Sequence, residues 1–461
     1  MQTPIFDFLR RYGESGASRF HMPGHKGCGA LGVEKFDITE ISGADVLYSP
    51  SGIILESENN ASELFGTAHT YYSAEGSTLG IKAMLAIALR AGKDGNRRIL
   101  AARNAHKAFI YAAALLDFEI DWIMPSESTH IASAIVTPCQ VKEALQKSAV
   151  LPCAVYITTP DYLGNIQDVK GISEVLEEFG IPLLVDNAHG AYLAFLEENM
   201  HPIKLGAAMC CDSAHKTLPV LTGGAYLHIS KKFEKFADGA RDMLSLFAST
   251  SPSYLILASL DAANKYIAEG YKEKLANAVS LVGNTKRELS LLGFAPEPSE
   301  PLKIVIRFSK YGLSGEDAAD RLRDFGCECE LSDKDYLVLM ATPENSASDF
   351  DRLIDAFKIL APKESITSVS VKMPYPEPVL SIREAIFAPS EIIPTENSAG
   401  RILSSPCVSC PPAVPIAISG ERISHESVKL FERYGIERVS VVKEDFLKTK
   451  YISENENEKN I

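Results

Sequence analysis

One lysine, Lys216, has the surroundings that covalent amine chemistry requires. It follows a predicted apolar strand (207–212), directly after His215 and three residues after Ser213. A lysine in this position can form a Schiff base with a carbonyl group, and a nearby hydroxyl can bind an anionic group of the same molecule. The alternative, a solvated surface lysine, fits poorly because the largely apolar segment 218–224 follows directly.

A carboxylate upstream of this lysine supplies the expected partner. Asp186 ends a second predicted apolar strand (181–186). It could pair with a pyridinium nitrogen and keep it protonated, so that the ring can accept the electron pair released at a substrate carbon. The alternative is a strand-end carboxylate that caps the following turn. Asp186 and Lys216, in this order, predict an enzyme that uses pyridoxal 5'-phosphate (PLP).

The phosphate of such a cofactor needs a cluster of N–H and O–H donors. Gly76, Ser77 and Thr78 open a predicted helix (79–90), and a helix N-terminus favours a dianion. Taken alone, the same residues also fit an ordinary N-terminal helix cap. Ser213 is expected to be a further phosphate donor.

Three histidines are placed to contact the cofactor. His106 lies just after a predicted strand (98–102), where its flat imidazole could stack on the ring. His189, three residues after Asp186, could flank the ring. His215 could contact the phosphate or shuttle a proton. For His106 and His189 the alternative is a structural histidine held in a loop. No residue is assigned to a metal.

These side chains need a scaffold that brings strand ends together. Between 31 and 265, short apolar runs alternate with helical periods, which predicts a mostly parallel sheet with helices on both faces. Ligands of such sheets bind beyond the carboxyl ends of the strands. A long helix (265–291) is expected to lead into a smaller α/β domain. The expected domains are an N-terminal segment (1–30), a PLP-binding large domain (31–265), a small α/β domain (266–372), and a C-terminal subdomain and tail (373–461) with 453–459 disordered.

Charge and composition exclude several other classes. The net charge of -14 argues against a nucleic-acid or anionic-membrane surface. We find neither an apolar stretch of membrane-spanning length nor a signal-peptide pattern in residues 1–11, and we therefore expect a cytoplasmic protein. Cys407 and Cys410 have redox-type spacing without a second pair. We expect reduced, incidental thiols.

The motifs also resemble a known family along nearly the whole chain. The segments that carry the resemblance are 19–27, 75–78, 104–107, 186–191, 213–217, 249–254 and 383–389. Together they resemble the bacterial ornithine/lysine/arginine decarboxylases, in the short form that lacks the N-terminal wing domain. The resemblance implies an α/β protein whose large domain has the PLP-dependent transferase (fold type I) architecture with a mostly parallel, seven-stranded sheet. Smaller C-terminal α/β domains would follow it.

By this resemblance, Lys216 is the Schiff-base lysine and Asp186 binds the pyridine nitrogen. His106 would stack on the ring. The phosphate would be bound by Ser77, Thr78, Ser213 and His215. His215 and Lys216 are the candidate acids that return a proton to the substrate carbon.

Two further residues enter through the resemblance. Ser249 resembles a phosphate ligand that reaches in from the neighbouring subunit, which implies a homodimer with shared active sites, or alternatively a tetramer. A Ser/Thr turn before a helix is the other interpretation of Ser249. Glu421 keeps a carboxylate expected near the distal cation of the substrate. The family's Tyr-Pro-Pro-Gly and Pro-Gly-Glu are replaced here at 410–413 and 419–421, so the choice among arginine, lysine and ornithine stays open.

The implied activity is PLP-dependent α-decarboxylation of a basic L-amino acid to its amine, in polyamine biosynthesis. The same lysine, aspartate and phosphate donors could also serve an aminotransferase or a carbon–sulfur lyase. A PLP-binding regulator without turnover and a purely structural dimer module are the remaining alternatives. An intact catalytic set argues against the regulator, and a structural module has no use for a buried lysine beside a strand-end aspartate.

Overall fold

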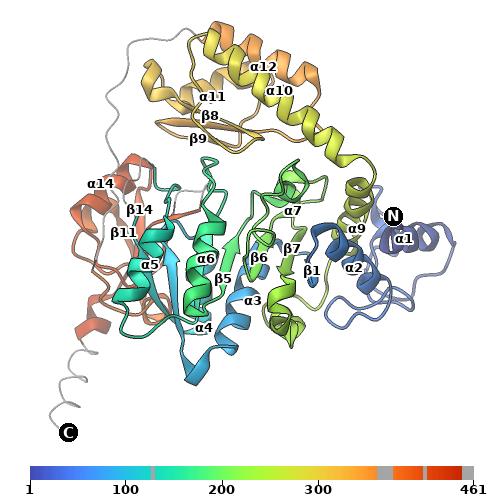
Figure 1. Cartoon of the computed structure of the whole chain (residues 1–461), viewed down its shortest axis with the longest axis horizontal. Helices are drawn as coiled ribbons and strands as arrows, with labels where there is room; N and C mark the ends of the chain where they lie inside the picture. The colour runs from blue at the N-terminus through green and yellow to red at the C-terminus, as the bar shows by residue number, and fades with distance from the viewer. Residues whose placement is uncertain (126–129, 361–376, 409–412, 449–461) are drawn as a thin grey trace.

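A computed structural model describes residues 1–125, 130–360, 377–408 and 413–448 (Figure 1). Cys410, the expected Pro-rich start of the C-terminal part (373–376) and the predicted disordered tail (453–459) lie outside these residues. Within them, no helix combines the length and the apolar character needed to cross a membrane. In Figure 1 the chain forms a large sheet covered by helices, a small layer of strands and helices above it, and a C-terminal part beside it.

The large sheet confirms the predicted mostly parallel architecture with seven strands. The strand order is β1-β7-β6-β5-β4-β2-β3, and within this sheet β7 alone runs antiparallel to its neighbours. β5 and β6 are parallel neighbours, so their carboxyl ends meet at one edge. The strands are β1 (His69–Ser73), β2 (Arg98–Ala102), β3 (Glu119–Ile123), β4 (Ala154–Thr158), β5 (Leu183–Asp186), β6 (Met209–Asp212) and β7 (Ala225–Ile229).

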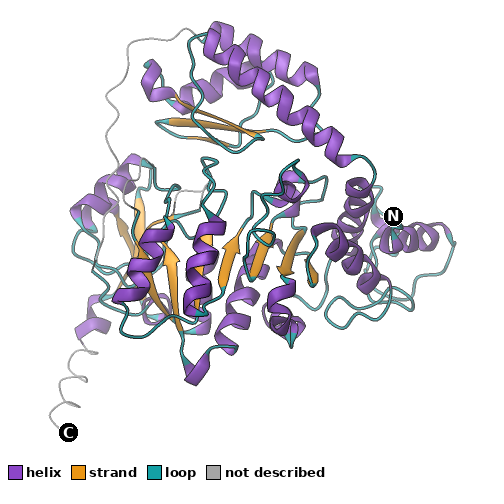
Figure 2. Ribbon diagram, viewed as in Figure 1, coloured by secondary structure: helices purple, strands orange, loops and turns teal. Residues whose placement is uncertain are grey.

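Helices cover both faces of this sheet, as Figure 2 shows. On one face, apolar residues of α5 and α6 pack on β4 and β5 in a single core. On the other face, α3, α4 and α8 form a second core, and α3 is buried along most of its length because its residues are apolar on every side. These helices are α3 (Gly76–Arg90), α4 (Lys107–Leu116), α5 (Pro138–Lys147), α6 (Val169–Phe179) and α8 (Ala240–Phe247).

The N-terminal segment contains a helix that its turn signals did not indicate. α1 (Pro4–Glu14) and α2 (Ile53–Phe65) pack on each other and on α9 (Tyr254–Ala268). The buried carboxylate of Asp261 accepts hydrogen bonds from the Ile5 and Phe6 amides, at 2.9 and 3.0 Å. These are amides that the first turn of a helix leaves without partners. The cap therefore comes from α9, far away in the sequence.

The long helix predicted at 265–291 is two helices. α9 ends at Ala268, and α10 (Tyr271–Leu291) begins after Gly270, whose φ of +86° turns the chain. α10 then packs on a three-stranded antiparallel sheet with the order β8-β10-β9. The small layer consists of β8 (Lys303–Arg307), α11 (Gly315–Asp324), β9 (Leu331–Ser332), β10 (Tyr336–Met340) and α12 (Ala347–Ile359). The chain after α10 thus forms the smaller α/β part that the sequence predicted.

The C-terminal part packs against α4 and returns to the large sheet. Arg383 donates a hydrogen bond to the Ala114 carbonyl at 2.8 Å, and the Lys107 amide donates to the Ala413 carbonyl at 3.0 Å. The second contact brings the segment that begins at Ala413 to the N-terminus of α4. The elements are α13 (Ile382–Phe387), β11 (Ser390–Pro394), β12 (Cys407–Val408), β13 (Pro415–Ala417), α14 (His425–Arg433) and β14 (Arg438–Val442).

The break between α9 and α10 predicts opposite effects for two glycine substitutions. Gly270→Ala should lower the free energy of unfolding by about 1 kcal/mol, because a side chain disfavours the left-handed conformation. No atom lies within 4 Å of either added methyl, so packing does not enter. Gly283→Ala, inside α10, should raise it by up to about 1 kcal/mol. Denaturant unfolding measures both, and equal effects would contradict this account.

Candidate active site

Lys216 and Asp186 line the same cavity, at the carboxyl edge of the large sheet. The cavity has a volume of about 210 Å³. Asp186 is the last residue of β5, and Lys216 lies in α7 (Ala214–Thr217), a single turn that follows β6. The cavity also contains His106, His189 and Ser77 among its lining residues. These residues were predicted to contact one cofactor from four separate segments of the sequence, and the fold brings them to one cavity.

Asp186 is buried and held in one orientation. It accepts hydrogen bonds from the Tyr156 hydroxyl and from the Ala188 amide, both at 3.2 Å. Burial raises the pKa of the Asp186 carboxyl, and Lys216 opposes this effect. A cationic ring nitrogen placed against this carboxyl would favour its ionised form in the same way. Asp186 therefore fits a pyridinium partner.

The cavity also favours an uncharged amine on Lys216. Burial lowers the pKa of Lys216, while Asp186 and then Glu330 act in the opposite direction. The Lys216 Nζ lies 3.0 Å from the His189 Nε2. Burial, and then the nearby Lys216, also hold the pKa of His189 well below its ordinary value. A neutral imidazole can accept a hydrogen bond from the lysine, and a deprotonated lysine is the form that attacks a carbonyl.

His106 is fixed by the helix that it starts. Its Nδ1 accepts a hydrogen bond from the Ala108 amide at 3.1 Å, which makes it the N-cap of α4. Burial, followed by the charges of Lys216 and Lys107, lowers the pKa of His106 to about 4. A neutral ring with a fixed orientation at the cavity wall suits stacking on an aromatic cofactor.

The expected phosphate donors meet at the N-terminus of α3. The Ser213 hydroxyl lies 2.8 Å from the Ser77 hydroxyl, although the two belong to distant segments. Gly76 begins the helix with a φ of +71°, a conformation that glycine adopts readily. Thr78 is exposed in the same turn. His215 Nδ1 lies 2.9 Å from the Gly224 carbonyl, so this nitrogen carries the proton.

Five predicted residues are not among those that line this cavity: Thr78, Ser213, His215, Ser249 and Glu421. Ser249 is exposed, and its amide donates to the Glu75 carboxylate at 2.7 Å, next to the start of α3. Glu421 is buried against Arg103, with 3.3 Å between the Glu421 carboxylate and the guanidinium. The Ile418 amide donates to the same carboxylate at 2.6 Å. The structure thus pairs Glu421 with residues of the protein itself.

Three cavity features were not singled out in the sequence. Tyr162 places its ring edge against His189, with 4.8 Å between ring centroids, and lies on the loop after β4. Asn104 has an amide with no hydrogen-bond partner among the described residues, which leaves it open to a polar ligand. Tyr162 and Asn104 both lie shortly after the carboxyl end of a strand, and this position could have identified them as candidate site residues from the sequence. Tyr156 lies inside β4, and nothing in the sequence indicated that its hydroxyl would donate a hydrogen bond to Asp186.

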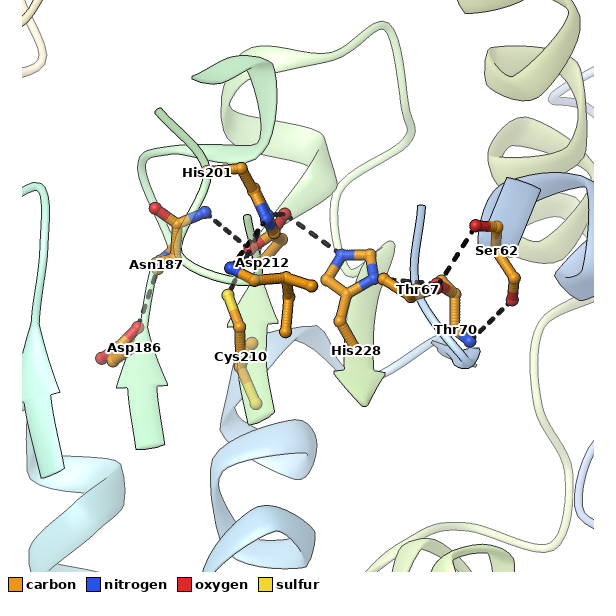
Figure 3. A network of polar contacts seen from close by, with 12 residues as sticks. Ser62, Thr67, Thr70, Asp186, Asn187, His201, Cys210, Asp212 and His228 are labelled. Carbon is orange, nitrogen blue, oxygen red and sulfur yellow. Dashed lines mark hydrogen bonds and ion pairs between the residues drawn. The ribbon is translucent and has the colours of Figure 1, made fainter. Parts of the chain in front are cut away.

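A second polar cluster joins the ends of β5 and β6, next to Asp186 (Figure 3). The buried Asp212 carboxylate accepts from His201 at 2.9 Å, His228 at 3.2 Å and Asn187 at 2.7 Å. Burial opposes ionisation, but the two histidines lower the pKa of Asp212 overall. His201, Cys210 and Asp212 also have the proximity of metal ligands. Because the hydrogen bonds already use their ligand atoms, we assign no metal to them.

Comparisons with known proteins agree with this geometry. Residues 3–293 match the model of the family described as "Orn/Lys/Arg decarboxylase, major domain". The chain is 30% identical to an arginine decarboxylase of Bacillus subtilis, over 93% of this chain and 92% of the relative. An arginine decarboxylase of Bacillus anthracis is 28% identical, over 94% of this chain and 93% of the relative.

A solved structure confirms the fold over almost the full length. The lysine decarboxylase LdcF of Francisella novicida superposes with a TM-score of 0.81 and 17% identity, over 96% of this chain and 81% of that one. With the cavity residues and the match to the family model, these similarities lead to one assignment. The chain belongs to the ornithine/lysine/arginine decarboxylase family.

Proposed function

We propose that this protein binds PLP and decarboxylates a basic L-amino acid to its amine. The observation that carries the proposal is the shared cavity of Lys216 and Asp186, beside the paired hydroxyls of Ser77 and Ser213. Relatives over nearly the whole chain are named arginine decarboxylases, so arginine is the first substrate to test, followed by lysine and ornithine. We further propose that the reaction belongs to polyamine biosynthesis in the cytoplasm.

The residues present suit the cofactor. Asp186 would pair with the ring nitrogen, His106 and the chain at Ala188 would flank the ring, and the unpartnered Asn104 amide offers further hydrogen bonds. The phosphate would be held at the start of α3 by Ser77, Thr78, Ser213 and His215. Bound PLP supplies an electron-accepting ring that receives the bonding electrons when carbon dioxide leaves.

The chain itself must manage orientation and protons. A flat slot between His106 and Ala188 would hold the breaking Cα–carboxylate bond perpendicular to the ring, where it overlaps the π-system. Lys216 and His215 are the candidates that return a proton to Cα. His189, neutral and 3.0 Å from Lys216, would accept a hydrogen bond from its amine and so orient it.

The alternatives differ in their products. An aminotransferase would release a keto acid, a carbon–sulfur lyase would release pyruvate, ammonia and sulfide, and a regulator would release nothing. A panel of basic and neutral amino acids, offered to the PLP-loaded protein with products identified by mass spectrometry, distinguishes them. Amine and carbon dioxide from a basic amino acid are expected. Any of the other products would refute the proposed reaction.

We also propose a homodimer whose active sites use both subunits, with a tetramer as the larger alternative. Large apolar side chains are exposed at Phe20, Met22, Leu31 and Leu246. An interface between subunits would remove such side chains from water, which favours association. Ser249 lies three residues from Leu246 and is itself exposed, as a residue that serves a neighbouring subunit must be.

Replacing the lysine should remove both turnover and the covalent link to the cofactor. Lys216→Ala should abolish amine release and the violet absorbance of bound PLP, because no other amine lines the cavity among the described residues. Borohydride reduction of the native holoprotein, followed by peptide mapping, should place the label on Lys216. Lys204→Ala, an exposed control, should change neither property. A label elsewhere would exclude Lys216 from this role.

Replacing Asp186 tests the ring-nitrogen contact. Asp186→Asn keeps the size of the side chain, but its neutral amide cannot stabilise a protonated ring nitrogen. We expect kcat to fall by about 100-fold, with bound PLP retained and its absorbance altered. Steady-state kinetics and absorbance spectra of the reconstituted protein measure these effects. A loss of less than about tenfold, roughly 1.4 kcal/mol, would contradict the assignment.

Mixed dimers test whether Ser249 acts across the interface. Ser249→Ala should weaken PLP binding, and Lys216→Ala should be inactive. If Ser249 serves the other subunit, a hybrid of these two variants contains one complete site, because the Ser249 of the inactive subunit completes the site of its partner. Its activity should exceed that of either parent after subunit exchange. Activity no higher than the parents' mean would place Ser249 in its own subunit's site.

A further inference from the structure

A carboxylate of the small layer contacts one of the residues that line the active-site cavity. Glu330 precedes β9 and accepts a hydrogen bond from the hydroxyl of Tyr162, whose ring lines the cavity. The Lys216 Nζ is 6.0 Å from the centroid of that ring. Glu330 is exposed. One aromatic side chain therefore connects the amine that acts on the substrate to an accessible anion on another part of the protein.

The loop that carries Tyr162 is held firmly against the small layer. Leu163 packs in one buried cluster with Val305 and Leu331. The buried Lys303 ammonium donates to the Asp161 carbonyl at 3.0 Å. Backbone and side-chain contacts thus fix the position of β9 relative to the loop that carries Tyr162. Glu330 keeps this position because it directly precedes β9.

The charges around the cavity make this carboxylate significant. The Lys303 Nζ lies 5.8 Å from the centroid of the Tyr162 ring, and the Glu300 carboxylate near it already pairs with this lysine at 3.7 Å. A cationic side chain of the substrate in this region would therefore need a further anion nearby. Asp186 is the one carboxylate among the described lining residues, and the proposed function commits it to the cofactor.

Glu421 is poorly placed for the same task in this structure. Its carboxylate is buried, faces the Arg103 guanidinium at 3.3 Å and accepts the Ile418 amide. Recruiting it for a substrate cation would leave Arg103, itself buried, without its ion-pair partner. Breaking one half of a buried pair is costly.

We infer that Glu330 binds the distal cation of the substrate and so selects basic amino acids. This inference rests on the proposed function and extends it to the specificity of the same site. A carboxylate offers about four acceptor positions, and the Tyr162 hydroxyl uses one of them. The remaining positions can receive an ammonium, or two parallel N–H groups of a guanidinium. Acidic side chains would be repelled, and neutral ones would gain nothing from Glu330.

Glu330→Gln removes the charge and keeps an oxygen that can accept from Tyr162. In the PLP-loaded enzyme we expect KM for the preferred basic amino acid to rise about tenfold or more, while kcat changes by less than about twofold. Binding of the corresponding product amine, measured by calorimetry, should weaken to a similar degree. Norleucine, the neutral analogue of lysine, should bind equally to both proteins, and the cofactor absorbance should stay unchanged.

Glu328→Gln is the matched control. Glu328 is exposed two residues away and pairs with Arg323, with 3.2 Å between the Glu328 carboxylate and the Arg323 Nε. The variant has the same net charge, but it should alter neither KM nor amine binding. If Glu330→Gln behaves like this control, the inference is wrong. A wild-type protein that releases no amine from arginine, lysine or ornithine would refute the proposed reaction, and amine binding would still decide the role of Glu330. Failure of the wild type to bind any amine would overturn both.

Discussion

A buried carboxylate and a buried amine at one edge of a parallel sheet set the requirements that the rest of the fold meets. Taking a carboxylate out of water is costly unless other groups hydrogen-bond to it, and burial favours the uncharged form of the amine. The Asp186 carboxylate accepts hydrogen bonds from a hydroxyl and an amide, and the Lys216 amine lies beside a neutral histidine. The parallel arrangement of β5 and β6 makes this possible because both strands end at the same edge.

Asp212 does not line the cavity, but it stabilises the two strand ends that carry Asp186 and Ser213. Asp212 ends β6, and its carboxylate receives donors from three side chains besides the Cys210 thiol. One of the donors, Asn187, directly follows Asp186. The network therefore ties the end of β5 to the end of β6, one residue from Ser213. This buried network favours a single geometry, because any displacement would leave the Asp212 carboxylate without its hydrogen bonds.

Local patterns predicted the mostly parallel sheet, because strands such as β2, β5 and β6 are short apolar runs, and they placed Asp186 and Ser213 at or just after the ends of β5 and β6. They could not predict contacts between distant segments. The break at Gly270 was missed because a glycine inside a helical period is locally tolerated. The ion pair of Arg103 with Glu421 joins residues 318 positions apart, and the contact of Tyr162 with Glu330 spans 168. The resemblance assigned Glu421 to the substrate, and only the folded structure shows that this carboxylate faces Arg103.

The C-terminal segment shows how such distant contacts complete the cavity. Ala413 lines it with a φ of +55°, in the left-handed region that glycine adopts more readily. The strained conformation, which costs about 1 kcal/mol, is held by contacts outside the segment. The Lys107 amide donates to the Ala413 carbonyl, and Arg103 donates to the Pro415 carbonyl while it pairs with Glu421. Lys107 and Arg103 lie on either side of His106 in the sequence. The segment 103–107, which would position the cofactor ring through His106, therefore also holds Ala413 and Pro415 in place. The cavity is lined by residues of the large sheet and by Ala413 of the C-terminal part, and its residue Tyr162 is held by Glu330 of the small layer. The cavity therefore has its shape only when these three parts of the chain are packed together.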